Sequence, residues 1–392
     1  MYSLILIKSK QILLACLSIL WFSATSYAQE SNSIPAANHT EDYLPFLKGF
    51  SIGVVSNQTS NIGTTHLVDS LVSLGINIKT VFAPEHGFRG NIDAGEYVKD
   101  GKDSKTGLPI ISLYGKNKKP KPEQIEDLDI LLFDIQDVGA RFYTYLSTLH
   151  YIMEAAAEAD IKVIVLDRPN PNAHYIDGPI LKAENSSFIG LHPVPIVYGM
   201  TIGEYAKMIN GEGWLQNEQK CDLRVIPLKN YNRNNAYELP VRPSPNLPNA
   251  QSIALYPSLC LFEGTPVSAG RGTEQQFQIF GSPDLDSELY TYTFTPQANL
   301  GAKYPKFKGE RCFGKDLSTY TPPNKIELQW LINAYKQYDN KSFFTPFFDK
   351  LAGNTSLKKK IISGMSAEKI RESWKSDLQD FQVIRSKYLI YP

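Results

Sequence analysis

Short apolar runs recur along the first half of the chain, each bounded by polar residues, glycine or proline. Four of them, FSIGVVSN, INIKTVFAP, LDILLFDI and IKVIVLD, are rich in β-branched residues and begin at positions 50, 76, 128 and 161. Runs of this length and composition are typical of buried parallel strands. Between them, apolar residues repeat at three-to-four spacing over residues 65–74 and 144–159, which predicts two helices.

Strands that alternate with helices predict an α/β fold built on a doubly wound, mainly parallel sheet. A helix over residues 201–210 and a strand over residues 221–228 extend this pattern to about residue 230. The pattern then breaks at RPSPNLPN and at a later glycine-rich stretch. Two further helices are predicted, near residues 325–338 and 366–376. We therefore expect a first domain over residues 42–230 and a second, smaller α+β domain over residues 231–392.

The first 28 residues have the features of a secretory signal peptide. Lys8 and Lys10 precede the apolar run ILLACLSILWF, and the small residues Ser26 and Ala28 stand where a signal peptidase cleaves. This run is too short to cross a bilayer comfortably, and we expect no membrane span in the mature chain. Lipid anchoring at Cys16 is the less favoured alternative, because apolar residues continue beyond it. We predict an exported protein, periplasmic or secreted, that starts with a flexible lead over residues 29–41.

Charge, cysteine and histidine content argue against several classes of protein. Without residues 1–28 the formal charge is about −2, and no basic patch indicates binding to nucleic acid. Cys221, Cys260 and Cys312 form an odd, widely spaced set, which predicts no disulfide framework or zinc cluster but leaves one bridge plus a free thiol open. The six histidines lack HxH or HExxH spacing, so we expect no metal site and no cofactor.

Glycine motifs for other chemistries are incomplete. The GEG at 211–213 and the GRG at 270–272 lack the third glycine and the strand-to-helix context of a nucleotide cradle. Residues 49–53 match the GxSxG nucleophile elbow, but Ser51 would lie at the start of a strand rather than on a strand-to-helix turn. Nucleotide binding and serine hydrolase chemistry are therefore disfavoured.

Acidic residues stand where successive predicted strands end. Glu85 follows the second strand, Asp134 and Asp137 close the third, and Asp167 with Arg168 closes the fourth. A single acid there is commonly a helix cap or a loop acceptor, but ligands of open α/β sheets bind where these ends converge. Carboxylates bind hydroxyls and perform acid–base chemistry, and aromatic rings stack on sugars, so such a cleft suits a carbohydrate. Further arginines and tyrosines of this region are Arg89, Arg141, Tyr143 and Tyr145.

Several long motifs occur in order along the chain. They are SNQTS, FAPEHGFRG, DAGExVxDxxDxxTGLPIxSLYG, FDIQDVGARFYTYLSTL, VLDRPNPN, RPSPNLPN and LFEGTPVSAGRGTEQQFQIFG. Together they resemble the exo-acting β-N-acetylmuramidase family of bacterial cell-wall glycosidases. The resemblance implies removal of terminal, non-reducing β-1,4-linked N-acetylmuramic acid from peptidoglycan-derived saccharides. It also implies a Rossmann-like catalytic domain with a smaller C-terminal domain that closes the cleft.

The same resemblance places the proposed catalytic glutamate, in the PEHG motif, at Glu85. A glycosidic oxygen leaves poorly unless a carboxylic acid protonates it, and Phe82, Pro84 and Phe88 would give Glu85 a partly apolar setting. His86 could hold this acid or a substrate oxygen, although a structural role is equally favoured. Asp134 is our candidate for the second catalytic group, while Asp137, Asp167, Glu263 and Glu274 also qualify, and the N-acetyl group of the sugar could assist instead.

Muramic acid carries a lactyl carboxylate, so a selective site should present an arginine. Arg141 and Arg271 are the candidates, and Arg271 lies in SAGRGTE, where glycines allow backbone to approach a ligand. The expected substrate-binding set is Asn57, His86, Gln136, Asp137, Arg141, Tyr143, Asp167, Arg168, Glu263, Arg271 and Glu274. The alternative function is a secreted saccharide-binding protein without turnover, which the intact PEHG and GRGTE segments disfavour.

Overall fold

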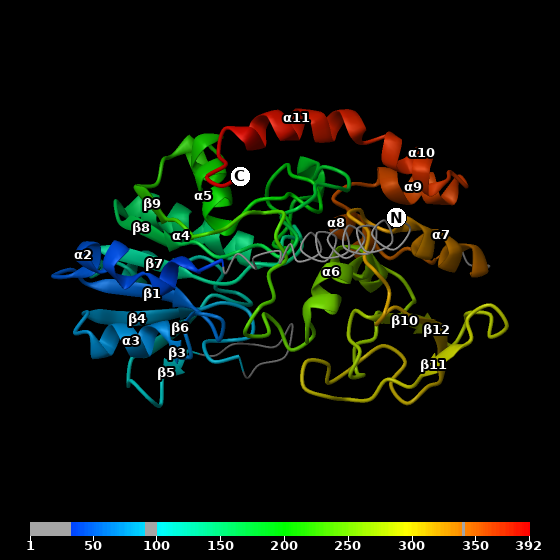
Figure 1. The fold of residues 1–392 in the computed structure, drawn as a ribbon, viewed down its shortest axis with the longest axis horizontal. Helices are drawn as coiled ribbons and strands as arrows, with labels where there is room; N and C mark the ends of the chain where they lie inside the picture. Colours follow the sequence, from blue (N-terminus) through cyan, green and yellow to red (C-terminus); the bar gives the residue numbers. More distant parts are fainter. Residues whose placement is uncertain (1–32, 91–99, 339–341) are drawn as a thin grey trace, which may run out of the picture. The chain divides into compact units, whose positions relative to one another are not determined.

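A seven-stranded sheet organises the first half of this computed structural model, which describes residues 33–90, 100–338 and 342–392. In spatial order the strands are β5 (Gly101–Lys102), β6 (Pro109–Ser112), β4 (Ile78–Ala83), β1 (Ile52–Ser56), β7 (Ile130–Asp134), β8 (Lys162–Leu166) and β9 (Leu223–Ile226). All neighbouring pairs are parallel except β5 with β6 (Figure 1). The parallel strands follow the Rossmann order 3-2-1-4-5-6, which confirms the predicted doubly wound α/β sheet.

Alternate residues of the central strands pack on opposite faces of the sheet. Phe133 and Val165 belong to one apolar cluster together with residues of α4 (Tyr145–Ala159) and α5 (Ile202–Gly211). Leu132 and Ile164 belong to a second cluster, which contains residues of α3 (Leu67–Ser73). Alternate side chains along each strand therefore pack into two separate apolar cores, and helices cover both faces of the sheet. Each fully buried side chain of this size stabilises the fold by about 1.5–3 kcal/mol.

The residues just before β1 are tied to the sheet. Ala36 and Ala37 are fully buried, and the Ala36 N–H donates to the Asp167 carbonyl over 3.0 Å. Ile34 and Lys229 exchange backbone hydrogen bonds in both directions. The described part of the lead expected to be flexible, from residue 33 onward, is thus packed. The signal segment 1–28 with Cys16, residues 29–32 and the motif stretch 91–99 lie outside the described residues.

The second half of the chain combines helices with a small antiparallel sheet, as the predicted α+β region requires. Its strands lie in the order β10 (Ile279–Ser282), β12 (Cys312–Asp316) and β11 (Tyr292–Phe294). Its helices are α6 (Ala250–Leu259), η6 (Cys260–Gly264), α7 (Leu328–Gln337), α8 (Pro346–Ala352), α9 (Ser356–Ile362), α10 (Ala367–Glu372) and α11 (Lys375–Ser386). The main apolar cluster joins residues from Val55 to Phe381, and the boundary at residue 230 stays a prediction. Within the described ranges, no helix is long and apolar enough to span a bilayer.

Shorter elements connect these parts. They are η1 (Ala36–Asn38), η2 (Thr40–Asp42), α2 (Leu44–Leu47), β2 (Asn61–Ile62), β3 (Thr65–His66), η3 (Pro122–Gln124), η4 (Ala183–Asn185) and η5 (Gln216–Glu218).

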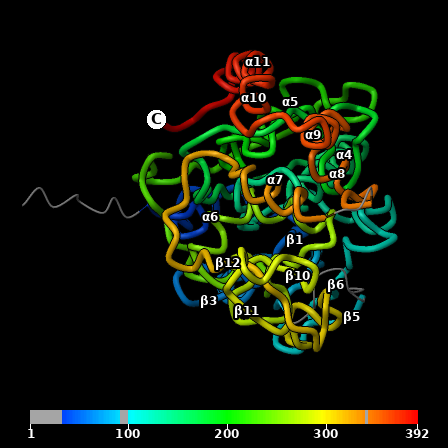
Figure 2. The backbone as a smooth tube through the Cα atoms, turned by 90° about the vertical axis from the view of Figure 1, so that its right-hand side faces the viewer, coloured from blue at the N-terminus to red at the C-terminus, as the bar shows by residue number. Residues whose placement is uncertain are grey.

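The C-terminal tail returns to the first half of the chain. α11 lies near α5 (Figure 2), and just beyond the last residues of the two helices Lys387 pairs with Glu212 over 3.2 Å. Beyond it, the Tyr391 hydroxyl donates to Asp167 Oδ2 over 2.7 Å, and the Ile390 N–H donates to Glu204 Oε1 over 2.8 Å. These bonds hold the last residues against the carboxyl end of β8.

Two buried histidines, one of them on α4, form a chain of hydrogen bonds. His192 Nε2 lies 3.0 Å from His150 Nδ1, and His192 Nδ1 lies 3.0 Å from the Tyr205 hydroxyl. Trp214 stacks on His192 with ring centroids 4.7 Å apart. The charged groups that face the pair are Glu154, 3.5 Å from His150, and Lys119, 2.8 Å from Glu154. Burial lowers the pKa of both histidines, and it does so most strongly for His192.

This pair should make the protein sensitive to mild acid. Because the folded state holds these pKa values below the ordinary 6.5, the unfolded chain takes up protons more readily than the folded protein as the pH falls. Their contribution to stability is therefore present above pH 6.5 and lost below it, at up to about 1.4 kcal/mol per pH unit and histidine. We expect His192→Gln to flatten the dependence of the free energy of unfolding on pH between 7 and 5, measured in urea. Parallel profiles for variant and wild type would contradict this.

Candidate active site

A cavity of about 560 Å³ lies beyond the carboxyl end of β4, and we call it the main cavity. Glu85, from the loop after β4, and Thr144, just before α4, line one side of it. Glu263 of η6 and Arg271 also line this cavity. Aromatic side chains make up much of the remaining wall: Tyr114, Phe142, Phe188, Tyr256, Tyr304 and Phe347. Carboxylates, an arginine and aromatic rings therefore share one pocket, a combination that suits a sugar.

A strained turn presents Glu85. The Gly87 N–H donates to the Pro84 carbonyl over 3.0 Å, so Glu85 and His86 are the two central residues of a turn. His86 has a φ of 70°, in the left-handed region that side chains other than glycine and asparagine rarely adopt. Strain of this kind concentrates at functional sites. His86 itself is buried and is absent from the lining of the main cavity, which favours a structural role for it.

Hydroxyl groups hold Glu85 in place. Thr144 does not cap α4 with its side chain; its hydroxyl donates instead to Glu85 Oε2 over 2.8 Å. Tyr114 also hydrogen-bonds the Glu85 side chain, and burial together with this carboxylate raises the pKa of Tyr114. The Tyr145 hydroxyl lies 3.3 Å from the Glu85 carbonyl and accepts a 2.9 Å bond from Asn57 Nδ2. Asn57 thus contacts the Tyr145 hydroxyl and does not itself line the main cavity.

Glu263 and Arg271, which line the same cavity as Glu85, form an ion pair with Arg271 Nε 3.3 Å from Glu263 Oε1. The Arg271 guanidinium also lies 5.2 Å from the centre of the Phe277 ring. The glycines on either side have a φ of 81°, and a Cβ on Gly272 would come within 2.6 Å of a carbonyl oxygen. The GRG sequence is therefore required by the backbone, and it sets Arg271 in the wall of the cavity.

Lys306, the second cationic side chain that lines the main cavity, binds backbone carbonyls. Lys306 Nζ donates to the carbonyls of Phe262 and Thr265, at 3.0 and 2.8 Å, and lies 3.2 Å from that of Glu263. Burial lowers the pKa of this lysine. Lys306 therefore fixes the loop that carries Glu263, and Arg271 is better placed to meet an anionic ligand.

Asp134 lies outside the main cavity. It is fully buried, and both of its oxygens bind the Arg168 guanidinium, with Oδ1 2.6 Å from Nε and Oδ2 2.8 Å from Nη2. Such a bidentate pair satisfies the carboxylate. The geometry gives Asp134 and Arg168 a structural role, and the catalytic role suggested by sequence stays a prediction that this geometry disfavours.

Asp137 and Asp167 are also buried away from the main cavity. Asp137 accepts from the Tyr198 hydroxyl and from the Gly139 N–H, and burial raises its pKa to about 6. Asp167 accepts from the hydroxyls of Tyr391 and Thr201, each over 2.7 Å, and burial raises its pKa to about 7. Both aspartates organise loops and the tail behind the site.

Arg141, Gln136 and Tyr143 bind backbone carbonyls instead of lining the main cavity. Arg141 is 2% exposed and donates to the carbonyls of Pro179, Val194 and Leu351, and burial lowers its pKa to about 9. Gln136 Nε2 donates to the carbonyls of Asp137 and Pro169. The Tyr143 hydroxyl donates to the Pro243 carbonyl over 2.7 Å. Arg141 is therefore placed to join three chain segments, not to meet a lactyl carboxylate.

Glu274, the remaining candidate, is exposed and lines a second cavity of about 480 Å³. The two cavities border the same turn, since Asn299 and Leu300 line the second and Gly301 and Ala302 line the main one.

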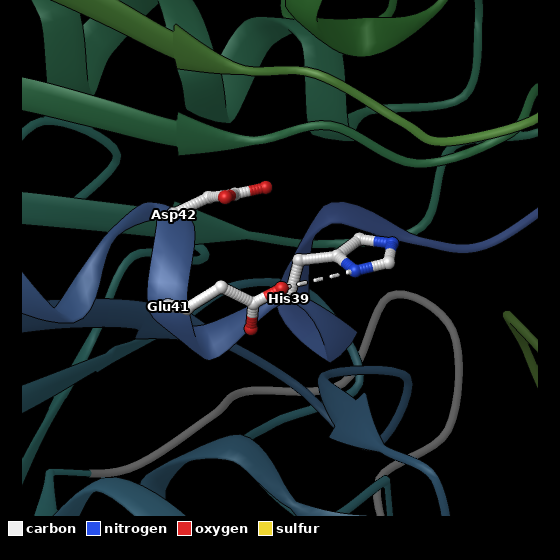
Figure 3. Close-up of side chains that lie close together, drawn as sticks. All are labelled: His39, Glu41 and Asp42. Carbon is white, nitrogen blue, oxygen red and sulfur yellow. Dashed lines mark ion pairs between the residues drawn. The ribbon is translucent and has the colours of Figure 1, made fainter.

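Among the described residues, one group could hold a metal ion: His39, Glu41 and Asp42, with ligand atoms within 4.8 Å of one another (Figure 3). The Lys229 ammonium already lies 3.3 Å from Glu41 Oε1 and 2.9 Å from Asp42 Oδ2. None of these three residues lines the main cavity, and we assign no metal ion to the group. Cys221, Cys260 and Cys312 are all buried free thiols, so the bridge left open by sequence is not formed.

Comparison with known proteins identifies the family. The models for the N-terminal and C-terminal parts of exo-β-N-acetylmuramidase NamZ match residues 52–251 and 254–391. The chain belongs to the NamZ family. A peptidoglycan β-N-acetylmuramidase NamZ of Bacillus subtilis strain 168 is 41% identical over 374 residues, 89% of each chain. Two crystal structures of DUF1343 family proteins from Bacteroides fragilis NCTC 9343 also match the NamZ-family chain. Their TM-scores are 0.86 and 0.79, at 46% and 29% identity, and each match covers 92% of this chain and 99% of the other.

Several residues that line the main cavity of this NamZ-family chain were not predicted as site residues from the sequence. Tyr114 and Thr144 lie inside the motifs SLYG and RFYTYL, and membership of these motifs is the signal in the sequence that could have indicated them. Tyr256, Tyr304 and Phe347 lie in segments without a distinctive pattern, and only folding brings them to Glu85.

Proposed function

We propose that this NamZ-family chain is an exo-β-N-acetylmuramidase in which Glu85 is the general acid. The reaction is hydrolysis of terminal, non-reducing β-1,4-linked N-acetylmuramic acid from peptidoglycan fragments. The observation that carries the role of Glu85 is its position: it is a carboxyl group on a strained turn, hydrogen-bonded by Thr144 and lining a cavity of aromatic rings. In this role the carboxyl protonates the glycosidic oxygen as the bond to the anomeric carbon breaks.

Glu263 is the carboxylate that best suits the second role. It lines the main cavity together with Glu85, whereas Asp134 does not. Its ion pair with Arg271 fixes its orientation, so Glu263 can act on water or orient the N-acetyl group of the sugar. The aromatic side chains supply flat apolar faces for the sugar ring.

Arg271 gives the site its preference for muramic acid in this proposal. The lactyl ether of that sugar ends in a carboxylate, and Arg271 offers a planar guanidinium at the cavity wall. The neighbouring Glu263 uses part of this donor set and leaves the remainder for the ligand.

Arg271→Met should lower kcat/KM on a β-N-acetylmuramide by about 10- to 100-fold, the range expected for losing a charged hydrogen bond. Activity on the matching β-N-acetylglucosaminide, which has no lactyl group, should change much less. Arg311→Met is the matched control, because Arg311 is exposed and stacks on Phe313 outside the cavity. Equal losses on both glycosides would show that Arg271 only braces Glu263.

The proposed activity is tested with the purified protein and nitrophenyl β-N-acetylmuramide. Release of nitrophenol, and release of free N-acetylmuramic acid from the disaccharide with N-acetylglucosamine, are the expected results. Binding of either substrate without release would favour a saccharide-binding protein.

Export is part of the same proposal, since peptidoglycan lies outside the cytoplasmic membrane. Support for it comes from the N-terminal sequence, with its two lysines, apolar run and small residues before position 29. Detection of a mature chain that begins near Gln29 in the exported fraction would test it.

A further inference from the structure

We infer that the second cavity is the binding site for the leaving N-acetylhexosamine, next to the main cavity that takes the muramic acid. This inference rests on the proposed function. Its lining includes Gln58, Arg242, Glu274, Gln276, Asn299 and Leu300, and its volume of about 480 Å³ lies in the usual range for small-molecule sites.

The position of this cavity relative to Glu85 is set by a short chain of hydrogen bonds. Gln58 Nε2 donates to the Pro243 carbonyl over 3.1 Å, and the Tyr145 hydroxyl lies 3.4 Å from the same oxygen. That hydroxyl lies 3.3 Å from the Glu85 carbonyl. One wall of the second cavity is thus connected to the Glu85 turn through a single tyrosine. A general acid must lie near the bond between the sugar that is cleaved off and the sugar that leaves, and Glu85 lines the main cavity while its turn is connected to the wall of the second.

The turn at residues 299–302 is the shared boundary. Asn299 and Ala302 exchange backbone hydrogen bonds of 3.1 Å in both directions, and Asn246 Nδ2 donates to the Gly301 carbonyl over 2.7 Å. Gly301 has a φ of 100°, and a Cβ there would come within 2.9 Å of Pro245. The two cavities are therefore separated at this point by a backbone turn of fixed conformation.

The lining of the second cavity calls for hydrogen-bond donors. Within the part of the chain that the structure describes, Gln58 Oε1, Gln276 Oε1 and Asn299 Oδ1 are buried acceptors without a partner. Gln276 is only 5% exposed. A buried amide oxygen left unpaired costs about 1–3 kcal/mol, which a ligand donor can recover. N-acetylhexosamine offers hydroxyls and an amide N–H that can serve as these donors.

The two charged groups of the lining do not require a charged ligand. Arg242 and Glu274 are both exposed, so solvent screens them and either can bind a sugar hydroxyl. A neutral sugar fits the unpaired acceptors, whereas a peptide with free carboxylates would meet the Glu274 carboxylate as well as Arg242.

The test compares two substrates with two variants. Gln276→Met removes the acceptor at nearly constant volume, and Leu300→Trp narrows the cavity from a position that is 68% exposed and so tolerant of change. Each should raise KM about 10-fold for the disaccharide of N-acetylmuramic acid and N-acetylglucosamine. Neither should change kcat/KM for nitrophenyl β-N-acetylmuramide more than about twofold. The matched control is Leu289→Trp, at a leucine that is 66% exposed and lines neither cavity.

Three results would overturn the inference. Unchanged KM for the disaccharide in folded Leu300→Trp would exclude a leaving-sugar site, and so would equal losses on both substrates. If, in an added assay with the peptide-bearing disaccharide, the variants altered only the ratio of rates on peptide-bearing and peptide-free disaccharides, the second cavity would hold a stem peptide instead. Failure of the wild type to cleave either substrate would reject the proposed function itself, which separates the two outcomes.

Discussion

Glu85→Gln should lower kcat on the natural disaccharide by about two to four orders of magnitude and leave substrate affinity nearly unchanged. Glutamine keeps the size of the side chain, and its amide oxygen can still accept the bond from Thr144. It has no proton to give to the glycosidic oxygen. The measurement is initial-rate kinetics with detection of free N-acetylmuramic acid, together with the affinity of the inactive variant for the disaccharide.

The structural alternative for Glu85 predicts a different result. If Glu85 only braced its turn, the variant would lose about 1 kcal/mol of stability and keep its activity. Glu126→Gln serves as the matched control, because Glu126 is exposed and does not line the main cavity. Near-wild-type turnover by folded Glu85→Gln would contradict the catalytic role of Glu85 and make Glu263 the next candidate for the general acid.

Asp134→Ala should lower the free energy of unfolding by about 3–5 kcal/mol. The substitution removes the bidentate partner of Arg168 and leaves a guanidinium that is only 4% exposed without its counter-charge. Urea unfolding followed by tryptophan fluorescence measures the change. Asp222→Ala is the control, since Asp222 is 61% exposed in its side chain and its pair with Lys162 should contribute less than about 1 kcal/mol.

The same variant separates a structural role of Asp134 from a catalytic one. Under strongly stabilising conditions, at low temperature and without denaturant, the folded fraction of Asp134→Ala should retain kcat to within a few-fold. A large fall in kcat with unchanged stability would instead support the catalytic role that its place at a strand end suggests.

The fold could be predicted well where the hydrophobic pattern of a short segment is enough to specify the element. The strands around Val54, Leu132 and Ile164 are apolar on both faces, and this pattern alone indicates a buried parallel sheet. Strands β5 and β6 were not predicted, since two and four residues beside Pro109 and Gly107 give too short a pattern. The predicted helix near 366–376 is interrupted, because α10 ends at Glu372 and α11 begins at Lys375.

The site was predictable only in part, for a geometric reason. Glu85 and Arg271 stand in motifs and both line the main cavity. Asp134 and Asp167 also stand at strand ends, but the sequence does not reveal that buried Arg168 and Tyr391 bind them. Whether a strand-end acid faces a cavity or a buried partner depends on residues far away in the chain.

The aromatic residues of the main cavity that were not predicted from the sequence illustrate this limit. Tyr304 is 92% exposed and lies at the main cavity, although nothing in its neighbours along the sequence distinguishes it from other surface tyrosines. Its relation to Glu85 exists only after the turn at residues 299–302 has formed.

The measurement that tests the role of Glu85 most directly is the dependence of the Glu85→Gln defect on the leaving group. A sugar alcohol needs protonation to leave, whereas nitrophenol departs readily as an anion. The account predicts a loss of about two to four orders of magnitude on the disaccharide and a much smaller loss, of about 10-fold or less, on nitrophenyl β-N-acetylmuramide. Equal losses on the two substrates, with the variant folded and binding normally, would contradict Glu85 as the general acid.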